Sequence, residues 1–436
     1  MVEDSAVVVW FSAPGFRQLA VAEVNGELVV DVETILVRVG CRSCGVLARP
    51  KDRRWVSVRD APAGDRPVVI RWRKRIWACV DPDCEARTWT EQRPDFVTTR
   101  HTLTVRAERW VFNRVAPIEG TPASCARLLG VSWSTAMSAV RRHGQPLIDD
   151  PLRVGVTVQV GFDETVMSPA RHLARRRFIT ATVDVQSGQI IDVFNGRDAR
   201  DLREWLGGQP VWWRDGIEVV SMDPHEGYRS AIKASVELIG EVMIVVDPFH
   251  VVRLANQALI KCRQRVQQAT HGHRGWTNDP LYDIRKLLLM GAEHLDDRAW
   301  ARIHEGLRFG DPHDLVQAAW CAKEFVRDVY ITNDPDEAAV ALNKAIVWCA
   351  DPDASPELVT LAKTLRKWKT EILNHHTTGA SNGKTEAANL TIKTVKRSGR
   401  GFRNLANYRL RILLAGGRLR ETQTVTRLRA RPRFIA

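Results

Sequence analysis

The central part of the chain carries short apolar runs separated by turns and by amphipathic segments. Three apolar runs come first, joined by tight turns, and two more runs alternate with segments of helical periodicity. Because apolar positions recur every two residues in a strand and every 3.6 in a helix, this pattern predicts three antiparallel strands, then helix, strand, helix and strand. The predicted strands cover Val154–Phe162, Arg177–Val185, Gln189–Phe194, Ile217–Met222 and Glu241–Val246, and the predicted helices cover Ala199–Leu206 and a segment from about Gly227.

This order of elements is the layout of a ribonuclease-H-like α/β core, in which the first and fourth strands are neighbours. Three predicted strands end in an acid, namely Asp163, Asp223 and Asp247, and His250 lies three residues after the last. We expect Asp163 and Asp223 to stand side by side, and a later helix can bring Glu386 to them. Three carboxylates together with phosphate oxygens can hold two Mg²⁺ or Mn²⁺ ions, of which one activates the attacking oxygen and the other stabilises the leaving oxygen.

We therefore predict Asp163, Asp223 and Glu386 as metal-binding catalytic acids. Asp247 and His250 are secondary candidates, and Asp247 competes for the second position because it too follows an apolar strand. Each acid taken alone is equally an ordinary strand-end or turn residue. On the helix that begins near Glu386, that carboxylate, the Asn389 amide and the Lys393 ammonium fall on one face, an arrangement that suits a metal-bound DNA end.

Two short helical segments precede this core. They cover Pro122–Leu129 and Trp133–Arg142, with Gly130 in the turn between them and Ser132 as a candidate N-cap. A third helical pattern covers His101–Ala116. A short turn between two helices predicts a helix-turn-helix, although short amphipathic helix pairs are also common without DNA binding.

Four of the eight cysteines form two close pairs near the N-terminus, Cys41 with Cys44 and Cys79 with Cys84. A predicted hairpin, with strands Trp55–Arg59 and Val68–Trp77 and a turn over Ala61–Pro67, would bring the pairs together. Four thiolates predict a closed structural zinc site without a catalytic position, and the alternative is four small buried residues. The basic residues on the second strand indicate that this domain faces DNA, beside Trp72 and Trp77: Arg71, Arg73, Lys74 and Arg75.

The positive charge of the chain is concentrated at one end. The 436 residues carry a formal charge of +13, and the segment from Thr391 to Ala436 supplies +12 of it, with Glu421 as its single acid. Such a segment is typical of a phosphate-contacting surface, and the alternative is a solvated tail. The candidate DNA contacts here are Asn389, Lys393, Lys396, Arg397, Arg400 and Arg403.

The sequence contains no apolar run of about 18 residues that would cross a membrane and no basic start of a secretory signal. The paired cysteines favour a reducing compartment. We therefore expect a cytoplasmic protein with DNA as its partner, and the family resemblance described next implies a bacterial, nucleoid-associated one.

Taken together, several motifs resemble the ISL-three family of bacterial insertion-sequence transposases. They are Asp163-Glu164, Ser221-Met222-Asp223-Pro224 with Tyr228, Asp247-Pro248-Phe249-His250, Ser381-Asn382-Gly383 with Glu386 and Asn389, Ile392-Lys393 with Lys396-Arg397, and Gly401-Phe402-Arg403-Asn404. The resemblance covers most of the chain. It implies a DDE transposase with a ribonuclease-H-like core, in which Asp163, Asp223 and Glu386 match the catalytic acids. It also implies an all-helical insertion, which fits the helical patterns of residues 256–370.

The expected fold is therefore a multidomain α+β protein. Its predicted parts are a zinc ribbon-like domain over 1–95, a helix-turn-helix over 96–150, the first part of the core over 151–255, the helical insertion over 256–370, and the end of the core with the basic segment over 371–436. The resemblance implies a homo-oligomer on terminal repeats and target DNA. Two alternatives stay open: a DNA-binding regulator with an inactive core, and a metal-dependent nuclease that does not join ends.

Overall fold

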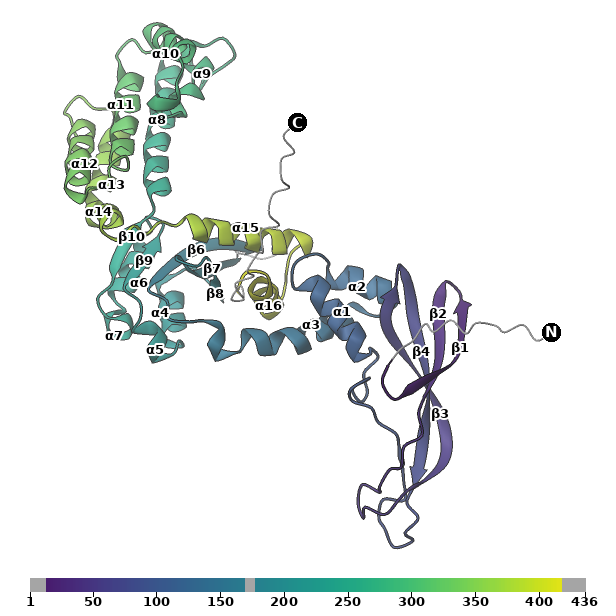
Figure 1. Cartoon of the computed structure of the whole chain (residues 1–436). Coiled ribbons are helices and arrows are strands. Elements are labelled where there is room, and N and C mark those ends of the chain that lie inside the picture. The colour runs from purple at the N-terminus through teal and green to yellow at the C-terminus, as the bar shows by residue number, and fades with distance from the viewer. Residues whose placement is uncertain (1–12, 169–176, 418–436) are drawn as a thin grey trace, which may run out of the picture. The chain divides into compact units, whose positions relative to one another are not determined.

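The computed structural model describes residues 13–168 and 177–417, which form a mixed α/β protein (Figure 1). The described residues divide into two compact units. The first contains residues 13–153 and 394–417, and the second contains residues 154–168 and 177–393. Each unit has its own five-stranded sheet.

The sheet of the first unit has the order β1-β2-β4-β3, with β5 paired to β4. Its core is aromatic, because the rings of Phe16, Trp72 and Phe96 lie 4.6–5.7 Å from one another between centroids. The predicted hairpin is present, but the predicted turn over 61–67 was too long. The two strands continue into both ends of that segment, and Gly64, at φ +66°, makes the tight turn between them. The first two strands were not predicted. The strands are β1 (Phe16–Val24), β2 (Glu27–Thr34), β3 (Arg49–Ala63), β4 (Arg66–Ala78) and β5 (Thr88–Thr90).

Three helices follow in the same unit, α1 (Val105–Val115), α2 (Pro122–Leu129) and α3 (Trp133–Ile148). The caps predicted from sequence are present. Ser132 accepts a hydrogen bond from the backbone N–H of Thr135, and Gly130 ends α2 in the left-handed conformation.

Helix α16 (Leu405–Gly416) packs against α3 in this unit. The contact is close at Gly144, where an added Cβ would lie 2.8 Å from Cδ1 of Leu414. Residues 394–417 of the basic C-terminal segment are therefore part of the same compact unit as α2 and α3. Residues 418–436 lie outside the described residues.

The sheet of the second unit has the order β10-β9-β6-β7-β8. Strands β6, β7 and β8 pair antiparallel, whereas β9 pairs parallel to both β6 and β10. The prediction that the first and fourth strands are neighbours is confirmed. The predicted end of the first strand was wrong, because β6 continues past Asp163. The strands are β6 (Gln159–Ser168), β7 (Arg177–Asp184), β8 (Ile190–Asn195), β9 (Val219–Met222) and β10 (Met243–Val246).

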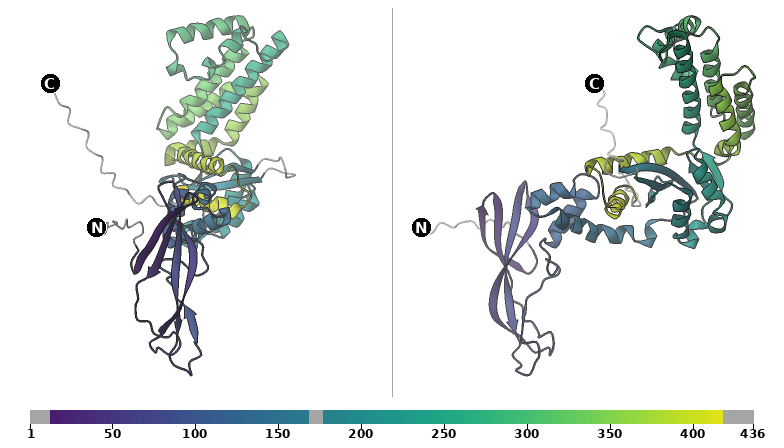
Figure 2. Two further views of the ribbon diagram at one scale, coloured as in Figure 1. Left: turned by 90° about the vertical axis from the view of Figure 1, so that its right-hand side faces the viewer. Right: turned by 180° about the vertical axis from the view of Figure 1, so that it is seen from behind.

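Every described element between β10 and α15 (Gly383–Ser398) is helical. Figure 2 shows these helices side by side as a bundle in both views. Their apolar faces bury residues such as Leu259, Val316 and Leu342. The longer members are α8 (Pro248–His271), α10 (Asp297–Gly310), α11 (Leu315–Asp328), α12 (Pro335–Cys349), α13 (Pro356–Lys367) and α14 (Lys369–Thr378); α9 (Pro280–Asp283) is a single turn.

Four further helices accompany the sheet: α4 (Ala199–Gly207), α5 (Val211–Arg214), α6 (Glu226–Lys233) and α7 (Val236–Ile239). None of the helices within the described ranges is both long and apolar enough to cross a bilayer.

Candidate active site and DNA-contact surfaces

Three acids lie at the same level on three neighbouring strands of the second unit. Phe162 of β6 and Val246 of β10 both pair with Met222 of β9. Asp163, Asp223 and Asp247 are the residues directly after these three. The register of the parallel strands thus places the three carboxylates along one line across the sheet.

His250, in the first turn of α8, connects two of these acids. Its Nδ1 lies 2.9 Å from Oδ1 of Asp223 and 3.5 Å from Oδ2 of Asp247. Burial opposes protonation of the ring, but the close contacts with both carboxylates and their negative charges raise the pKa of His250 to about 10. At this pKa the ring between Asp223 and Asp247 is an imidazolium at neutral pH.

Asp247 is the most enclosed of the three acids, with a side chain 5% exposed. Its Oδ1 accepts a hydrogen bond of 2.7 Å from the backbone N–H of Asn382, just before α15. Burial acts to raise the pKa of Asp247, but the hydrogen bonds from His250 and Asn382 outweigh it and lower the pKa. Asp247 is therefore ionised at neutral pH, and its hydrogen bond with Asn382 ties the end of β10 to the start of α15.

Asp163 has the opposite electrostatic environment. Burial, followed by the nearby charge of Asp223, raises the pKa of Asp163 to about 7. The side-chain Nδ2 of Asn389 donates a hydrogen bond to Asp163 Oδ2, and Asn389 Oδ1 accepts one of 3.1 Å from Thr165. Asn389 is 5% exposed. The amide lies inside the protein and contacts an acid, so we leave Asn389 out of the proposed DNA-contacting set.

The helix that carries Asn389 approaches β6 closely at a glycine. A Cβ on Gly161 would lie 2.2 Å from Oγ1 of Thr385 and 3.1 Å from Oδ1 of Asn382, so only glycine fits at this strand position. The same helix carries Glu386, which is exposed. A carboxylate oxygen of Glu386 lies within 4.8 Å of ligand atoms of Asp247 and His250. The structure thus brings Glu386 to the same end of the sheet as the three acids.

The acids in this site have the chemistry of a divalent-cation site. Carboxylate oxygens are the ligands that Mg²⁺ and Mn²⁺ prefer. The charge of Asp223 makes ionisation of Asp163 unfavourable, and a bound cation would relieve that repulsion. The donor types therefore fit the expected metal. The ligand atoms of this site that all lie within 4.8 Å of one another belong to Asp247, His250 and Glu386, whereas Asp163 and Asp223 are placed near them by the strand register. Sequence analysis did not identify the contribution of Thr165, whose only signal was its two-residue spacing from Asp163 on β6.

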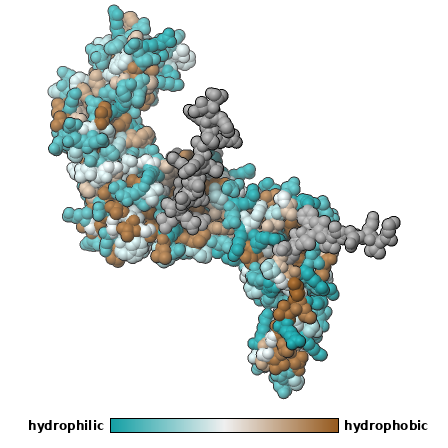
Figure 3. Space-filling model, in the orientation of Figure 1, coloured by the Kyte–Doolittle hydropathy of each residue, from teal (hydrophilic) through white to brown (hydrophobic). Residues whose placement is uncertain are grey.

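The four paired cysteines meet at the base of the β3–β4 hairpin. The Sγ atoms of Cys41 and Cys84 lie 3.7 Å apart, and those of Cys44 and Cys79 lie 3.5 Å apart. Zinc–sulfur bonds of about 2.3 Å in a tetrahedron require sulfur–sulfur distances of about 3.8 Å. The cluster is therefore compatible with a zinc ribbon. Figure 3 shows apolar surface at this lower end of the sheet, where the exposed residues include Leu36, Val37, Val46, Leu47 and Val80.

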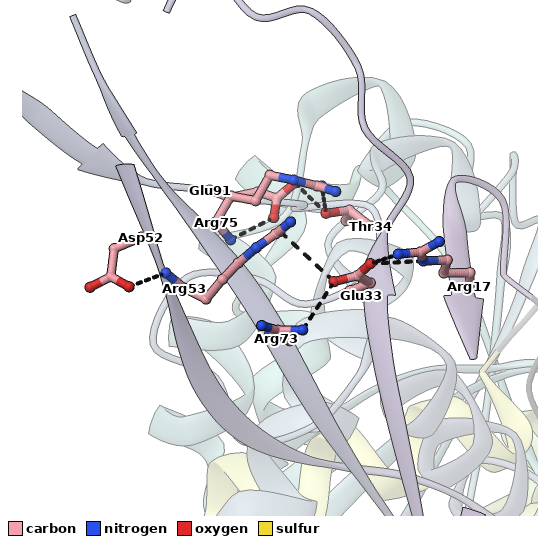
Figure 4. Close-up of polar contacts among 8 residues, drawn as sticks. All are labelled: Arg17, Glu33, Thr34, Asp52, Arg53, Arg73, Arg75 and Glu91. Atoms are coloured by element: carbon pink, nitrogen blue, oxygen red, sulfur yellow. Dashed lines mark hydrogen bonds and ion pairs between the residues drawn. The ribbon is translucent and has the colours of Figure 1, made fainter. Parts of the chain in front are cut away.

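The basic residues of β4 are less available to DNA than the sequence indicated. Arg75 is 3% exposed and donates a hydrogen bond of 2.6 Å to Oγ1 of Thr34. Arg73 lies 4.0 Å from the buried carboxylate of Glu33 (Figure 4). Burial acts to raise the pKa of Glu33, but the hydrogen bond from Arg17 and the surrounding arginine charges lower it.

Two further residues of this strand have partners on the sheet. Arg71 is paired with Asp31, and the Lys74 ammonium lies 4.1 Å from the ring centroid of Trp72. Trp72 and Trp77 are both buried. We therefore leave Arg75, Trp72 and Trp77 out of the proposed DNA-contacting set, because the sheet encloses them.

The basic residues after Thr391 are mostly exposed, as a DNA contact requires. Among the candidate DNA contacts of this segment Lys396 is half-buried, and burial lowers its pKa. Two basic residues outside that set are also enclosed, since Arg409 is half-buried and Arg411 is buried. The exposed members are Lys393, Arg397, Arg400 and Arg403.

Sequence comparisons give independent information about the chain. Residues 160–412 match the sequence model of a family described as transposase, DDE_Tnp_ISL3. Two transposases for insertion sequence element IS1557, from two strains of Mycobacterium tuberculosis, are each 25% identical to the chain over 409 residues. The aligned region covers 86% of this chain and 86% of each relative. It therefore extends well beyond the strands that carry the acids.

Proposed function

Because the chain belongs to the ISL-three family of transposases, we propose that it binds the ends of an insertion sequence, cleaves them and transfers their 3′-OH groups into target DNA. The observation that carries this proposal is the register of β6 and β9, which sets Asp163 and Asp223 after paired residues, with Glu386 at the same end of the sheet. The strand order, with β9 and β10 parallel to β6, supports a ribonuclease-H-like core.

In the proposed mechanism Asp163, Asp223 and Glu386 hold Mg²⁺ or Mn²⁺. When bound, these ions would activate the attacking oxygen and stabilise the leaving oxygen of the phosphoryl transfer. The protein's own residues prepare the site. Asn389 fixes the orientation of the Asp163 carboxylate, and His250 holds Asp223 against Asp247.

Asp247 has a supporting role in this proposal. It is enclosed, accepts the Asn382 N–H and contacts His250. The oxygens of Asp247 are therefore more fully occupied by contacts within the protein than those of Asp223, whose side chain is 33% exposed. This difference favours Asp223 over Asp247 as the second metal-binding acid.

DNA binding is proposed for the helix-turn-helix and for two sets of basic residues. The first set is Arg71, Arg73 and Lys74 of β4, and the second is Lys393, Lys396, Arg397, Arg400 and Arg403. Structural zinc is proposed at the four cysteines. Assembly into a homo-oligomer on DNA and a cytoplasmic, nucleoid-associated location stay predictions.

The decisive experiment is joining of pre-cut element ends to a plasmid, with Mg²⁺ and with EDTA, by the wild-type protein and by Asp163→Asn, Asp223→Asn, Asp247→Asn and Glu386→Gln variants. We expect Mg²⁺-dependent joining that is abolished in Asp163→Asn, Asp223→Asn and Glu386→Gln, with DNA affinity retained. Cleavage without joining would support the nuclease alternative, and DNA binding without either reaction would support the regulator. If Asp247→Asn abolishes joining and Asp223→Asn does not, the second acid is Asp247.

A further inference from the structure

A second candidate site lies in the first unit. It is a pocket of about 570 Å³ between the beginnings of α2 and α3 and the loop 398–404 that joins α15 to α16. Four arginines line it and no acidic residue does, among those that the structure describes: Arg127, Arg400, Arg403 and Arg411. Its volume is within the range of about 300–1,000 Å³ that ligand sites have.

The informative member of this group is Arg411. It is 2% exposed, yet its Nε and Nη2 atoms have no hydrogen-bond partner among the residues that the structure describes. Burial lowers the pKa of Arg411, but a guanidinium keeps its charge at neutral pH. A buried cation without a counter-ion is unfavourable, so such groups are normally paired. At Arg411 the missing partner is an anion, and the pocket is where an anion can enter.

The surroundings of Arg411 favour the same ligand. The first turn of α2, which lines the pocket, presents the positive end of the helix dipole. Arg141 donates both its Nε and Nη2 hydrogens to Oδ1 of Asn407, at 3.1 and 2.8 Å. Because that oxygen is committed to Arg141, Asn407 can offer the pocket its amide hydrogens, which are donors. Exposed Arg127, Arg400 and Arg403 add positive charge around the pocket.

We propose that this pocket binds one nucleotide unit of the DNA backbone, with the phosphate on the buried guanidinium of Arg411. A phosphate fits because arginine recognises its oxygens through two parallel hydrogen bonds. The exposed Trp133 ring at the pocket gives the sugar an apolar surface. The contact is to the backbone, so it positions the helix-turn-helix on DNA without recognising sequence. This inference rests on the proposed DNA-binding function and adds to it a specific clamp.

The test uses the full-length protein and its Arg411→Met variant, with Arg109→Met as the matched control, because Arg109 is exposed on α1 and outside this pocket. Binding of a fluorescent DNA duplex is measured as a function of salt. We expect Arg411→Met to weaken binding to any duplex roughly tenfold and to reduce the salt slope by about one. Arg109→Met should change neither.

Thermal unfolding without DNA separates this role from a structural one. Replacing an unpaired buried charge by an apolar side chain of similar length should leave the unfolding temperature unchanged or raise it. Inorganic pyrophosphate should raise the unfolding temperature of the wild type and not of Arg411→Met. A variant that unfolds at lower temperature and binds DNA as the wild type does would overturn the proposal.

Protection by pyrophosphate together with unchanged DNA binding would assign the pocket to a free anion and reject the DNA clamp. The proposed transposase function is tested separately, since joining activity with normal DNA affinity in Arg411→Met would reject only the clamp. The acid variants give the converse test. If they lose joining but their DNA binding still depends on Arg411, the clamp proposal stands.

Discussion

Nδ1 of His250 lies 2.9 Å from Oδ1 of Asp223, and the same nitrogen lies 3.5 Å from Oδ2 of Asp247. One imidazolium thus joins a more exposed acid to an enclosed one. In the proposed mechanism this contact fixes the direction in which Asp223 presents its oxygens. His250 is a positioning residue in this sense, since it acts through the carboxylates.

The contact predicts a specific effect of replacing the ring. His250→Asn should lower the rate of strand cleavage by about 10–100-fold, as loss of a supporting group around a metal site generally does. Affinity for element-end DNA should stay as in the wild type. Cleavage is measured on labelled element ends over a Mg²⁺ series, with His294→Asn, at an exposed histidine of the helical bundle, as the control. Equal cleavage by His250→Asn and the wild type would show that Asp223 needs no such support.

The close contact between Gly161 and Thr385 gives a second prediction, with a built-in rescue. In Gly161→Ala the new Cβ meets Thr385 Oγ1, because the two would lie 2.2 Å apart. We expect α15 to shift away from β6, which weakens the Asn389–Asp163 hydrogen bond and lowers cleavage by at least tenfold. Removing the obstructing hydroxyl in Gly161→Ala with Thr385→Ala should restore part of the activity. The measurement is cleavage by both variants and by Thr385→Ala alone.

A rescue that fails completely would mean that the remaining neighbours of Gly161, at 3.0–3.1 Å, cannot adjust. Gly161→Ala with wild-type activity would contradict the argument, because the approach of α15 would then not depend on the glycine. Circular dichroism of each variant separates a local shift from general unfolding.

The sequence was informative about the second unit because its strands are short and each one has its own run of apolar residues. Periodicity placed five strands, and the position of the acids after them anticipated the line of carboxylates. The exact end of β6 was missed because Asp163 and Glu164 look like a strand end, whereas buried Thr165 and Met167 continue the alternation.

The remaining differences between expectation and structure depend on contacts that are distant in sequence. Asn389 was expected on DNA, but its burial follows from the approach of α15 at Gly161. Arg75 was expected on DNA, but Thr34 of β2, a strand that was not predicted, holds it inside. Pairings between residues far apart in the chain leave no local periodic signal, and sequence patterns alone therefore do not predict which charged residues are enclosed.

The cysteine cluster gives a third prediction. Cys41→Ser and Cys79→Ser should each reduce bound zinc from one ion per chain to well below one, because a hydroxyl does not replace a thiolate in a closed site. Cys321→Ser is the matched control, since Cys321 lies outside the cluster. Zinc is measured by mass spectrometry on purified protein. Unchanged zinc in both cluster variants would reject the site, and loss in Cys321→Ser would question the assay.

The fourth prediction concerns the metal-free protein and follows from the raised pKa of Asp163. Burial and the charge of Asp223 raise that pKa from 3.8 to about 7, so the folded protein holds this proton over a pH range in which the unfolded chain has released it. The proton on Asp163 therefore contributes to the free energy of unfolding of the wild type at low pH. This contribution should be lost as pH rises from about 4 to about 7. Asp163→Asn, which is always neutral, should not lose it.

In EDTA, the unfolding temperature of Asp163→Asn should exceed that of the wild type by a few degrees at pH 8, and the difference should shrink towards pH 4.5. The control is Asp184→Asn, an acid at the end of β7 that pairs with Val160, whereas Asp163 pairs with Ala181 of the same strand. Mg²⁺ added at pH 8 should raise the unfolding temperature of the wild type more than that of Asp163→Asn, because only the wild type presents the carboxylate. If the difference in unfolding temperature between Asp163→Asn and the wild type is constant with pH, Asp163 is ionised throughout. If both proteins respond equally to Mg²⁺, Asp163 does not belong to the metal-binding set.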